Sequence, residues 1–272
     1  MTPSDFQSPA SSSRRGFLRR LGGLGAGMAA RPSLASALPA RPAGAKSMGA
    51  CAAPKLDTVK VAIIGVGARG PTHLSHAAAA EGTVFVGVCD LYEDAARRGV
   101  EMALRADPER HKGVKAYFGD ERAYRKMLAE TKPDAVWIAT PWEWHAPMAI
   151  DAMKAGAHAF VEVPLGVGIE ELWEIVDVSE KTRRHCMMME NVNYGRDELM
   201  FLNMCRQGIF GELLHGEAAY IHELRGQMRE YERGRGTGSW RTLHWASENG
   251  NLYPTHGLGP VAKYMNHARG EE

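Results

Sequence analysis

The chain has 272 residues, is 44% hydrophobic, and carries 33 Lys and Arg against 32 Asp and Glu. A chain of this length and hydrophobic content can bury one or two ordinary cores. The balanced charge, with no stripe of Lys and Arg interleaved with aromatic residues, argues against nucleic-acid binding. Beyond residue 50 no apolar run approaches the roughly 20 residues that span a bilayer. We therefore predict a soluble, globular protein with no nucleic-acid partner and no membrane span.

Residues 1–57 form a distinct segment that is rich in Ala, Gly, Ser, Pro and Arg. Within it, Ser13-Arg14-Arg15-Gly16-Phe17-Leu18-Arg19 resembles the twin-arginine export motif, and a mildly apolar stretch and a small-residue cleavage pattern follow at Leu21–Ala30 and Ala35-Ser36-Ala37. We predict a signal peptide and linker over 1–57, and a periplasmic or secreted protein. A disordered basic tail is the alternative, and lipid attachment at Cys51, which follows a poor lipobox, is a minor one.

The chain contains four cysteines, at Cys51, Cys89, Cys186 and Cys205. They form no C-x-x-C pair and are too sparse for a disulfide framework. We therefore predict free or buried thiols. No group of His, Cys and Asp has the spacing of a metal site, so no metal is expected.

A glycine-rich turn follows the first strand expected in the chain. Val59–Ile64 is a short apolar run typical of a buried strand, and it leads directly into Gly65-Val66-Gly67-Ala68-Arg69-Gly70. In this G-x-G-x-x-G pattern Gly65 allows the tight turn, Gly67 lets a pyrophosphate approach the backbone, and Gly70 lets the next helix pack closely. The free N–H groups at the start of that helix then face the phosphates. The pattern predicts a dinucleotide-binding unit.

A second apolar strand is expected at Val84–Val88, and it ends at Cys89-Asp90. Asp90 follows Gly70 by 20 residues. A carboxylate at this place would bind both hydroxyls of the adenosine ribose and repel a 2′-phosphate, so we infer NAD rather than NADP. The alternative is that Asp90 only caps the following helix.

The alternation of strands and helices continues as a doubly wound sheet requires. The expected elements are a strand at Asp134–Thr140, a helix at Ala146–Ala155, a strand at His158–Val163, a helix at Ile169–Arg183 and a final strand at Cys186–Met189. Ligands of such sheets bind at the carboxyl ends of the strands. Trp142, His145, Glu162 and Asn191 are therefore expected on one rim, within a Rossmann domain that covers 58–191.

With these residues in view, the chain resembles the glucose-fructose oxidoreductase and inositol dehydrogenase superfamily, and within it glycoside hydrolase family 109, the NAD-dependent alpha-N-acetylgalactosaminidases. The resemblance covers 58–272 and rests on separated motifs: Thr140-Pro141-Trp142-Glu143-Trp144-His145, Glu162-Val163-Pro164, Glu190-Asn191-Val192-Asn193-Tyr194-Gly195, Ala219-Tyr220-Ile221-His222, Trp240-Arg241, and Asn249-Gly250-Asn251-Leu252-Tyr253-Pro254-Thr255-His256-Gly257. Dehydrogenases of the superfamily carry a lysine where this chain has Val163. Valine can neither donate nor accept a proton, so the substitution favours the glycosidase-like family.

The resemblance implies a redox route to glycoside cleavage that needs no pair of carboxylates at the anomeric carbon. A hydride leaves C3 of the sugar for NAD, a base removes the acidified C2 proton, and the C1 substituent is eliminated. Water then adds at C1 and the hydride returns to C3. Each turnover is therefore net hydrolysis of a terminal alpha-N-acetylgalactosaminide with retention, and the cofactor is regenerated.

The resemblance also assigns residues. It implies NAD contacts at Gly65, Gly67, Arg69, Gly70, Asp90, Trp142, Glu143, Trp144, His145, Glu162, Val163 and Asn191. It implies substrate contacts at Tyr220, Arg241, Tyr253, Pro254, Thr255 and His256. His256 is the best candidate for an acid or base because imidazole titrates near working pH, and Tyr253 could serve the other proton transfer, with the two roles open to exchange.

Several of these residues have plainer alternatives. Tyr194 and His222 are weaker candidates that would serve equally well as structural residues. Trp142 and Trp144 could simply pack the rim of the sheet. His145 could replace a helix N-cap instead of contacting the cofactor.

The segment 192–272 is expected to begin a substrate-binding α+β domain. Asp197–Gln207 has the spacing of a helix, Leu213–Leu224 alternates as the first strand of an open antiparallel sheet would, and Arg225–Gly238 is expected to be a flexible loop over the site. Members of the resembling family continue well beyond residue 272, so we expect a truncated domain and an inactive fragment as one outcome. The rival functions are a sugar dehydrogenase of the same superfamily and a non-catalytic NAD-binding remnant. A homo-oligomer is compatible with these features.

Overall fold

The computed structural model describes residues 47–49, 51–229, 235, 237–249, 251 and 253–266. The chain divides into the units Met1–Gly44 and Ala45–Glu272, and only the second is described. The expected signal peptide, with Arg14, Arg15 and the cleavage pattern, lies outside the described residues. Its prediction therefore stays a prediction.

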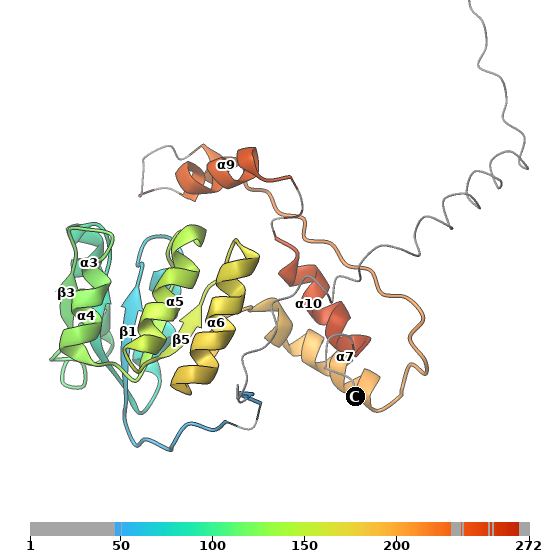
Figure 1. Cartoon of the computed structure of the whole chain (residues 1–272), viewed down its shortest axis with the longest axis horizontal. Helices are drawn as coiled ribbons and strands as arrows, with labels where there is room; N and C mark the ends of the chain where they lie inside the picture. The colour runs from blue at the N-terminus through green and yellow to red at the C-terminus, as the bar shows by residue number, and fades with distance from the viewer. Residues whose placement is uncertain are drawn as a thin grey trace, which may run out of the picture. The chain divides into compact units, whose positions relative to one another are not determined.

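The expected parallel sheet is present, with six strands in the order β3-β2-β1-β4-β5-β6 and every neighbouring pair parallel (Figure 1). The strands are β1 Val59–Ile64, β2 Thr83–Cys89, β3 Lys115–Tyr117, β4 Ala135–Ile138, β5 His158–Val161 and β6 Cys186–Met188. The order reverses between β1 and β4. This is the Rossmann order, in which the crevice at the reversal binds the dinucleotide.

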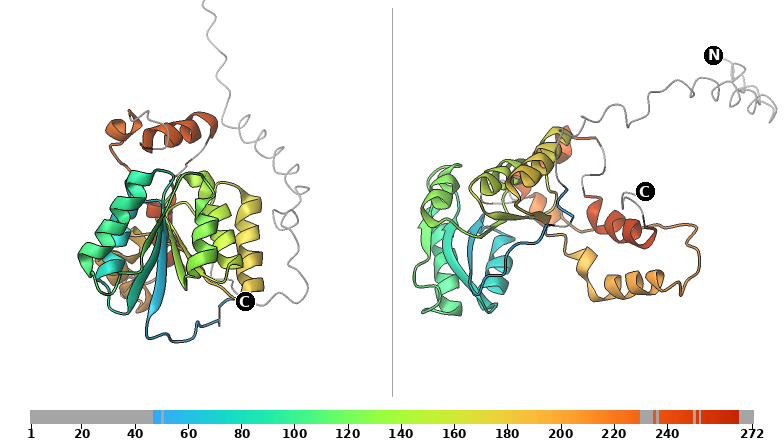
Figure 2. Two further views of the ribbon diagram at one scale, coloured as in Figure 1. Left: turned by 90° about the vertical axis from the view of Figure 1, so that its left-hand side faces the viewer. Right: turned by 60° about the horizontal axis from the view of Figure 1, so that its bottom comes forward.

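Helices cover both faces of the sheet (Figure 2). They are α2 Gly70–Ala79, α3 Glu93–Ala106, α4 Ala123–Thr131, α5 His145–Lys154 and α6 Ile169–Thr182. Strand β1 shows why: Ala62 and Ile64 pack into the core under α4, α5 and α6, whereas Val61 and Ile63 pack into the core under α2 and α3. A parallel strand buried on both faces must be apolar at every position, which is the pattern that predicted it.

The strands and helices expected over 59–189 are confirmed, with ends that differ by at most two residues. The sequence analysis assigned nothing between Asp90 and Asp134, where the structure has α3, β3 and α4. Strand β3 has only three residues, too few for a periodic apolar pattern to appear.

After residue 190, the regular elements of the described chain are all helices, and 207–224 has no regular secondary structure. This part contains the short 3₁₀ helix η4 Val192–Tyr194, followed by α7 Arg196–Arg206, α8 Arg225–Met228, α9 Thr237–Ser247 and α10 Thr255–Tyr264. Helices α7 and α10 pack against each other. The helix expected at 197–207 is confirmed to within one residue.

Two expectations for this half are wrong. The strand expected over 213–224 is not formed, and with it the beginning of the antiparallel sheet is missing from the described residues. Alternation of apolar residues cannot make a strand alone, since a strand needs a neighbour for its backbone hydrogen bonds, and no described segment pairs with 213–224. The expected loop 225–238 begins instead with the helical turn α8 and ends in α9, while 230–234 and 236 lie outside the described residues.

The four cysteines are free. Burial raises the pKa of the Cys89 and Cys186 thiols to about 12, so neither is a reactive thiolate near neutral pH. In the described part of the chain, no group of three or more His, Cys, Asp or Glu could hold a metal ion. No helix among the same residues is long and apolar enough to cross a membrane.

Candidate functional site

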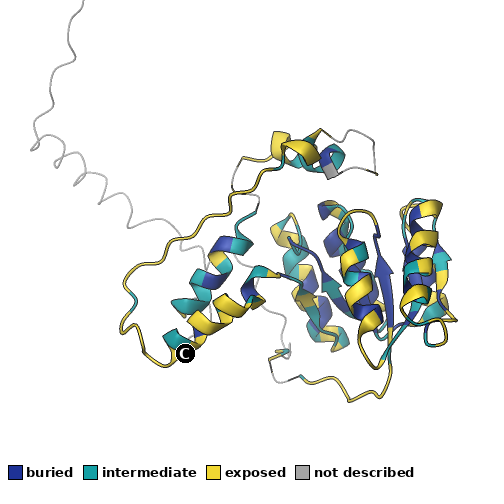
Figure 3. Cartoon of the chain, turned by 180° about the vertical axis from the view of Figure 1, so that it is seen from behind, coloured by how far each residue is buried: buried dark blue, intermediate teal, exposed yellow. Residues whose placement is uncertain are grey.

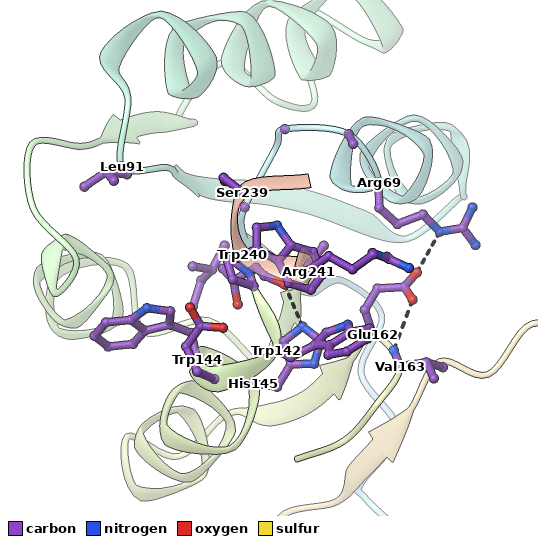
Figure 4. Close-up of a pocket in the computed structure, with 18 of the residues that line it drawn as sticks. Arg69, Leu91, Trp142, Trp144, His145, Glu162, Val163, Ser239, Trp240 and Arg241 are labelled. Carbon is purple, nitrogen blue, oxygen red and sulfur yellow. Dashed lines mark hydrogen bonds and ion pairs between the residues drawn. The ribbon is translucent and has the colours of Figure 1, made fainter. Parts of the chain in front are cut away.

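A cleft of about 1170 Å³ lies at the carboxyl ends of the strands. One wall is the rim of the sheet, with Arg69, Trp142, Glu162 and Val163, and the other comes from α9 and the segments beside it (Figure 4). The cleft also contains residues from the end of β2, among them Asp90, Leu91 and Tyr92. The reversal of strand order thus coincides with this cleft, as it does in dinucleotide-binding sheets.

The glycine loop has the geometry that the pattern predicted. Gly65 has φ +87°, and a Cβ there would lie 2.6 Å from the carbonyl oxygen of Ala139. A Cβ on Gly70 would lie 1.9 Å from the oxygen of Gly65, so α2 can approach only because residue 70 has no side chain. At Gly67 no atom lies within 4 Å of the Cβ position, which leaves open space over the loop. The cradle therefore fits the pyrophosphate of NAD.

Asp90 lies at the end of β2 and lines the cleft. Its Oδ2 accepts a hydrogen bond from the Val66 N–H at 2.9 Å, and its Oδ1 accepts one from the Tyr92 N–H at 3.0 Å. Helix α3 has Tyr92 as its N-cap residue, so Asp90 is not the N-cap. The two bonds fix the carboxylate at the edge of the glycine loop, where it is placed to meet a ribose.

Glu162 is at the centre of a charged network at the end of β5. Its Oε1 accepts hydrogen bonds from Arg69 Nε at 2.7 Å and His73 Nε2 at 2.5 Å, and its Oε2 accepts one from the Val163 N–H at 3.1 Å. Burial of the Glu162 carboxyl acts to raise its pKa, but the bonds from His73, Arg69 and Val163 outweigh it and lower the pKa to about 2. The carboxylate is therefore ionised at all ordinary pH values.

The sequence analysis missed His73, which lies three residues into α2. Nothing in the sequence marks this residue, because its partner Glu162 is 89 positions away. Only the fold brings the two together, because the start of α2 and the end of β5 lie at the same rim of the sheet.

The motif at the end of β4 forms the 3₁₀ helix η3, Trp142–Trp144, and then α5. His145 is buried, and its Nδ1 and Nε2 lie 2.5 Å and 2.8 Å from the carbonyl oxygens of Pro164 and Thr140. Burial lowers the pKa of His145, although both carbonyl contacts oppose this. The N-cap residue of α5 is Trp144, so the N-cap alternative for His145 is wrong. The imidazole instead joins the ends of β4 and β5 beneath the cleft.

An aromatic cluster closes the cleft from α9. Trp142 is buried and meets the rings of Trp240 at 5.1 Å and Tyr253 at 6.1 Å. The guanidinium of Arg241 lies 5.1 to 5.9 Å from the ring centres of the same three residues. Its buried Nε has no hydrogen-bond partner, and burial lowers the pKa of the group. Among the described residues Arg241 has no carboxylate partner, and a cation held among aromatic faces is suited to a polar ligand.

Three of the substrate residues expected from the sequence come together beside this cluster. The rings of Tyr220 and Tyr253 stack at 4.7 Å, and His256 lies edge-on to them at 5.1 Å and 4.8 Å. All three line the cleft. His222 also lines it and contacts the Tyr220 hydroxyl through Nδ1 at 2.5 Å. Burial raises the pKa of Tyr253 to about 12. Its phenol therefore stays protonated near neutral pH and can act as a proton donor.

The remaining expected residues differ in position. Glu143, Trp144, Val163 and Asn191 line the cleft. Pro254 and Thr255 do not, because they begin α10 behind Tyr253. Tyr194 does not line it either, and its ring instead lies 4.4 Å from the Lys263 ammonium.

The sequence analysis quoted Glu190 in a motif but gave it no role. The structure places this buried carboxylate at the end of β6 in contact with Nδ1 of His256. The pairing bridges 66 positions, so spacing could not reveal it.

Comparison with known proteins gives two adjoining family matches. Residues 59–190 match the model of the oxidoreductase family with an NAD-binding Rossmann fold, and residues 194–272 match the C-terminal domain of glycosyl hydrolase 109. NAD is therefore the cofactor of this fold, and the residues of the cradle fit it.

Curated relatives agree. The chain is 53% identical over 286 residues to glycosyl hydrolase family 109 protein 1 of Akkermansia muciniphila, covering 96% of this chain and 58% of the relative. It is 50% identical over 262 residues to the alpha-N-acetylgalactosaminidase of Shewanella oneidensis, covering 95% and 56%. The chain thus spans little more than half the length of these relatives.

Among solved structures, scyllo-inositol dehydrogenase of Lactobacillus casei, with bound NAD(H) and scyllo-inositol, superposes with a TM-score of 0.61. The alignment covers 77% of this chain and 56% of that protein at 18% identity. At this identity the likeness concerns the fold alone.

Proposed function

The chain belongs to glycosyl hydrolase family 109, and from this premise we propose that it is an NAD-dependent glycosidase acting on terminal alpha-N-acetylgalactosaminides. The support is a relative that bears the name alpha-N-acetylgalactosaminidase and is 50% identical. Because the matched part is 56% of that relative, the activity, the glycan substrate and any partner of this chain remain our proposal.

The residues at the rim of the sheet would hold the cofactor. The open space over Gly67 takes the pyrophosphate, Asp90 takes the adenosine ribose, and Glu162 with Arg69 lies farther along the same rim. When bound there, NAD would supply a reversible hydride acceptor for C3 of the sugar. Hydride transfer needs a site from which water is excluded, and the packed rings of Trp142 and Trp240 would help to exclude it.

The residues on the opposite wall would bind and deprotonate the sugar. Arg241 can donate hydrogen bonds to hydroxyl or amide oxygens, since no group of the described residues accepts one from its Nε. His256 can accept a proton at Nε2, because Nδ1 is engaged with Glu190. Tyr253, with its raised pKa, keeps its proton and can give it at Oη.

The observation that carries the proposal is the convergence of Tyr220, Arg241, Tyr253 and His256 on the same cleft as the glycine loop. Val163 lies in the same cleft and is 4% exposed, and it offers no ionisable group. The proton transfers would therefore fall to His256 and Tyr253 rather than to a lysine at residue 163. This favours the glycosidase over a dehydrogenase that depends on that lysine.

The test is turnover of a chromogenic alpha-N-acetylgalactosaminide in deuterated water, with the Shewanella oneidensis relative as the positive control. We expect deuterium at C2 of the product and no net consumption of NAD. His256→Ala and Tyr253→Phe should each lower kcat by about 10² to 10⁴-fold, the usual contribution of a placed proton donor or acceptor. Product without deuterium at C2 would show direct displacement at C1 instead.

We also propose that the protein is exported by the twin-arginine route. The support is the sequence around Arg14 and Arg15 alone. Export in a folded state would let the protein cross with its cofactor already bound. Replacing both arginines by lysine should leave the protein in the cytoplasm, as shown by cell fractionation, and continued appearance in the periplasm would refute the route.

A further inference from the structure

Glu190 is 2% exposed, yet it is a carboxylate at the carboxyl end of the last strand. Four donors surround it. Its Oε2 accepts from the Asn193 N–H at 2.8 Å and from the side-chain amide of Asn193, and its Oε1 accepts from the Val192 N–H at 3.3 Å and contacts His256 Nδ1. A buried charge persists when hydrogen bonds of this kind satisfy it. The Glu190 carboxylate therefore acts only as a hydrogen-bond acceptor toward the groups around it.

This arrangement decides the tautomer of His256. A neutral imidazole carries one proton, and the nitrogen that faces an acceptor-only group must be the protonated one. Because Glu190 Oε1 faces Nδ1, the proton belongs on Nδ1 and the lone pair on Nε2. The Nε2 atom has no partner among the described residues, and His256 lines the cleft.

A close helix contact keeps His256 on Glu190. A Cβ on Gly259 would lie 2.4 Å from Asn193 Nδ2, so α10 packs directly over Asn193. Residue 256 lies in the first turn of the same helix. The absence of a side chain at residue 259 thus sets the distance at which the helix delivers His256 to the carboxylate.

We propose that Glu190 is a positioning residue that holds His256 in its Nδ1-protonated tautomer and so presents the Nε2 lone pair to the cleft. The catalytic meaning of this pair rests on the proposed function, in which His256 removes a proton from the sugar. The assignment of the tautomer does not rest on the proposed function. Glu190 touches neither sugar nor cofactor and acts only through the imidazole.

The substitution Glu190→Gln should reverse the tautomer without changing the shape of the site. At the Oε2 position the fixed N–H of Asn193 and its side-chain amide both demand an acceptor, whereas at Oε1 only the longer bond from Val192 does. The glutamine oxygen should therefore take the Oε2 position and its NH₂ should face His256. Nδ1 then has to accept, and the proton moves to Nε2.

The experiment is ¹⁵N NMR of the purified chain with labelled histidines, at a pH where the imidazoles are neutral. The His256 signals are assigned by their loss in His256→Gln. We expect Nδ1–H in the wild type and Nε2–H in Glu190→Gln. The matched control is Glu217→Gln, because Glu217 also lies near a histidine, His215, but is 90% exposed at its side chain. That control should leave His256 unchanged.

Wild-type protein with Nε2–H at His256 would overturn the proposal, and so would an unchanged tautomer in folded Glu190→Gln. If Glu190→Gln fails to fold, the wild-type measurement still decides. Where glycoside turnover is detected, Glu190→Gln should lower kcat by about 10² to 10⁴-fold with little change in KM, as when the carboxylate of a catalytic triad is neutralised. Absence of turnover in the wild type would count against the proposed function and leave the tautomer result standing.

Discussion

The two matched regions of the chain are held together in different ways. In 59–190 the sheet is buried on both faces, and its strands supply side chains to two cores. In 194–266 the buried apolar side chains are few, and many large ones are exposed, including Leu199, Met200, Phe201, Ile209, Phe210, Leu214, Ile221, Leu243, Trp245 and Leu258 (Figure 3). The first region has its own core, whereas the described part of the second region is positioned by its contacts with the first.

The contacts between the two regions include residues of the candidate site. Arg241 lies over Trp142, Tyr253 meets the same indole, and His256 meets Glu190. The binding wall of the second region is thus positioned by groups at the strand ends of the first. The difference teaches that substitutions in the buried core of 59–190 should act mainly on stability, and those at the strand ends and in the second region mainly on function.

The largest expected effect is in the core of the first region. Phe85 is fully buried in β2, and Phe85→Ala should cost about 3 to 5 kcal/mol of unfolding free energy because it removes a whole aromatic side chain from a packed core. Phe201 on α7 is 44% exposed, and Phe201→Ala should change the same quantity by less than about 0.5 kcal/mol. Urea unfolding measures both. Equal losses would show that the second region has a core of its own.

The next effect concerns Glu162 and acid. Its pKa of about 2 in the folded state lies below the ordinary 4.5, so the bonds to His73 and Arg69 stabilise the fold fully above pH 4.5 and progressively less as the pH falls toward 2. With allowance for solvent around Arg69, the contribution is on the order of 2 kcal/mol. Glu162→Gln should be less stable than wild type at pH 6 and approach it near pH 2. A difference that stays constant with pH would contradict this.

A smaller effect separates cofactor binding from stability within the first region. Gly67→Ala places a methyl group in open space and should leave the unfolding free energy unchanged while weakening NADH binding by about tenfold or more, since the methyl lies where the pyrophosphate approaches. Gly113→Ala is the control, because its Cβ position is also open. Fluorescence titration with NADH measures the Kd of each. An unchanged NADH affinity in Gly67→Ala would show that the pyrophosphate does not bind at this loop.

The smallest effect is a change of preference. Asp90→Ser removes the charge that repels a 2′-phosphate, and a few-fold loss of NAD affinity should accompany a gain for NADP of about tenfold. Equal Kd values for the two cofactors in the wild type would refute the role of Asp90.

The sequence by itself determined the first region except for 91–133, where α3, β3 and α4 were not predicted. Unbroken apolar runs marked β1, β2, β4 and β5, and the pattern of Gly65, Gly67 and Gly70 marked the turn between β1 and α2. These signals are local, because a strand buried on both faces and a glycine at positive φ each restrict the residues at their own positions. The separated motifs after residue 190 indicated the family and included Asn191, Tyr220, Arg241, Tyr253 and His256, which line the cleft.

Only the tertiary structure decided which groups meet. It paired His73 with Glu162 and Glu190 with His256, and it left 213–224 without a partner strand although the alternation favoured one. Each of these outcomes depends on the approach of segments that are distant in the chain. The local sequence pattern predicts which side of a helix or strand is buried. It does not predict which residue of a distant segment packs against it, because that depends on the packing of whole helices and strands.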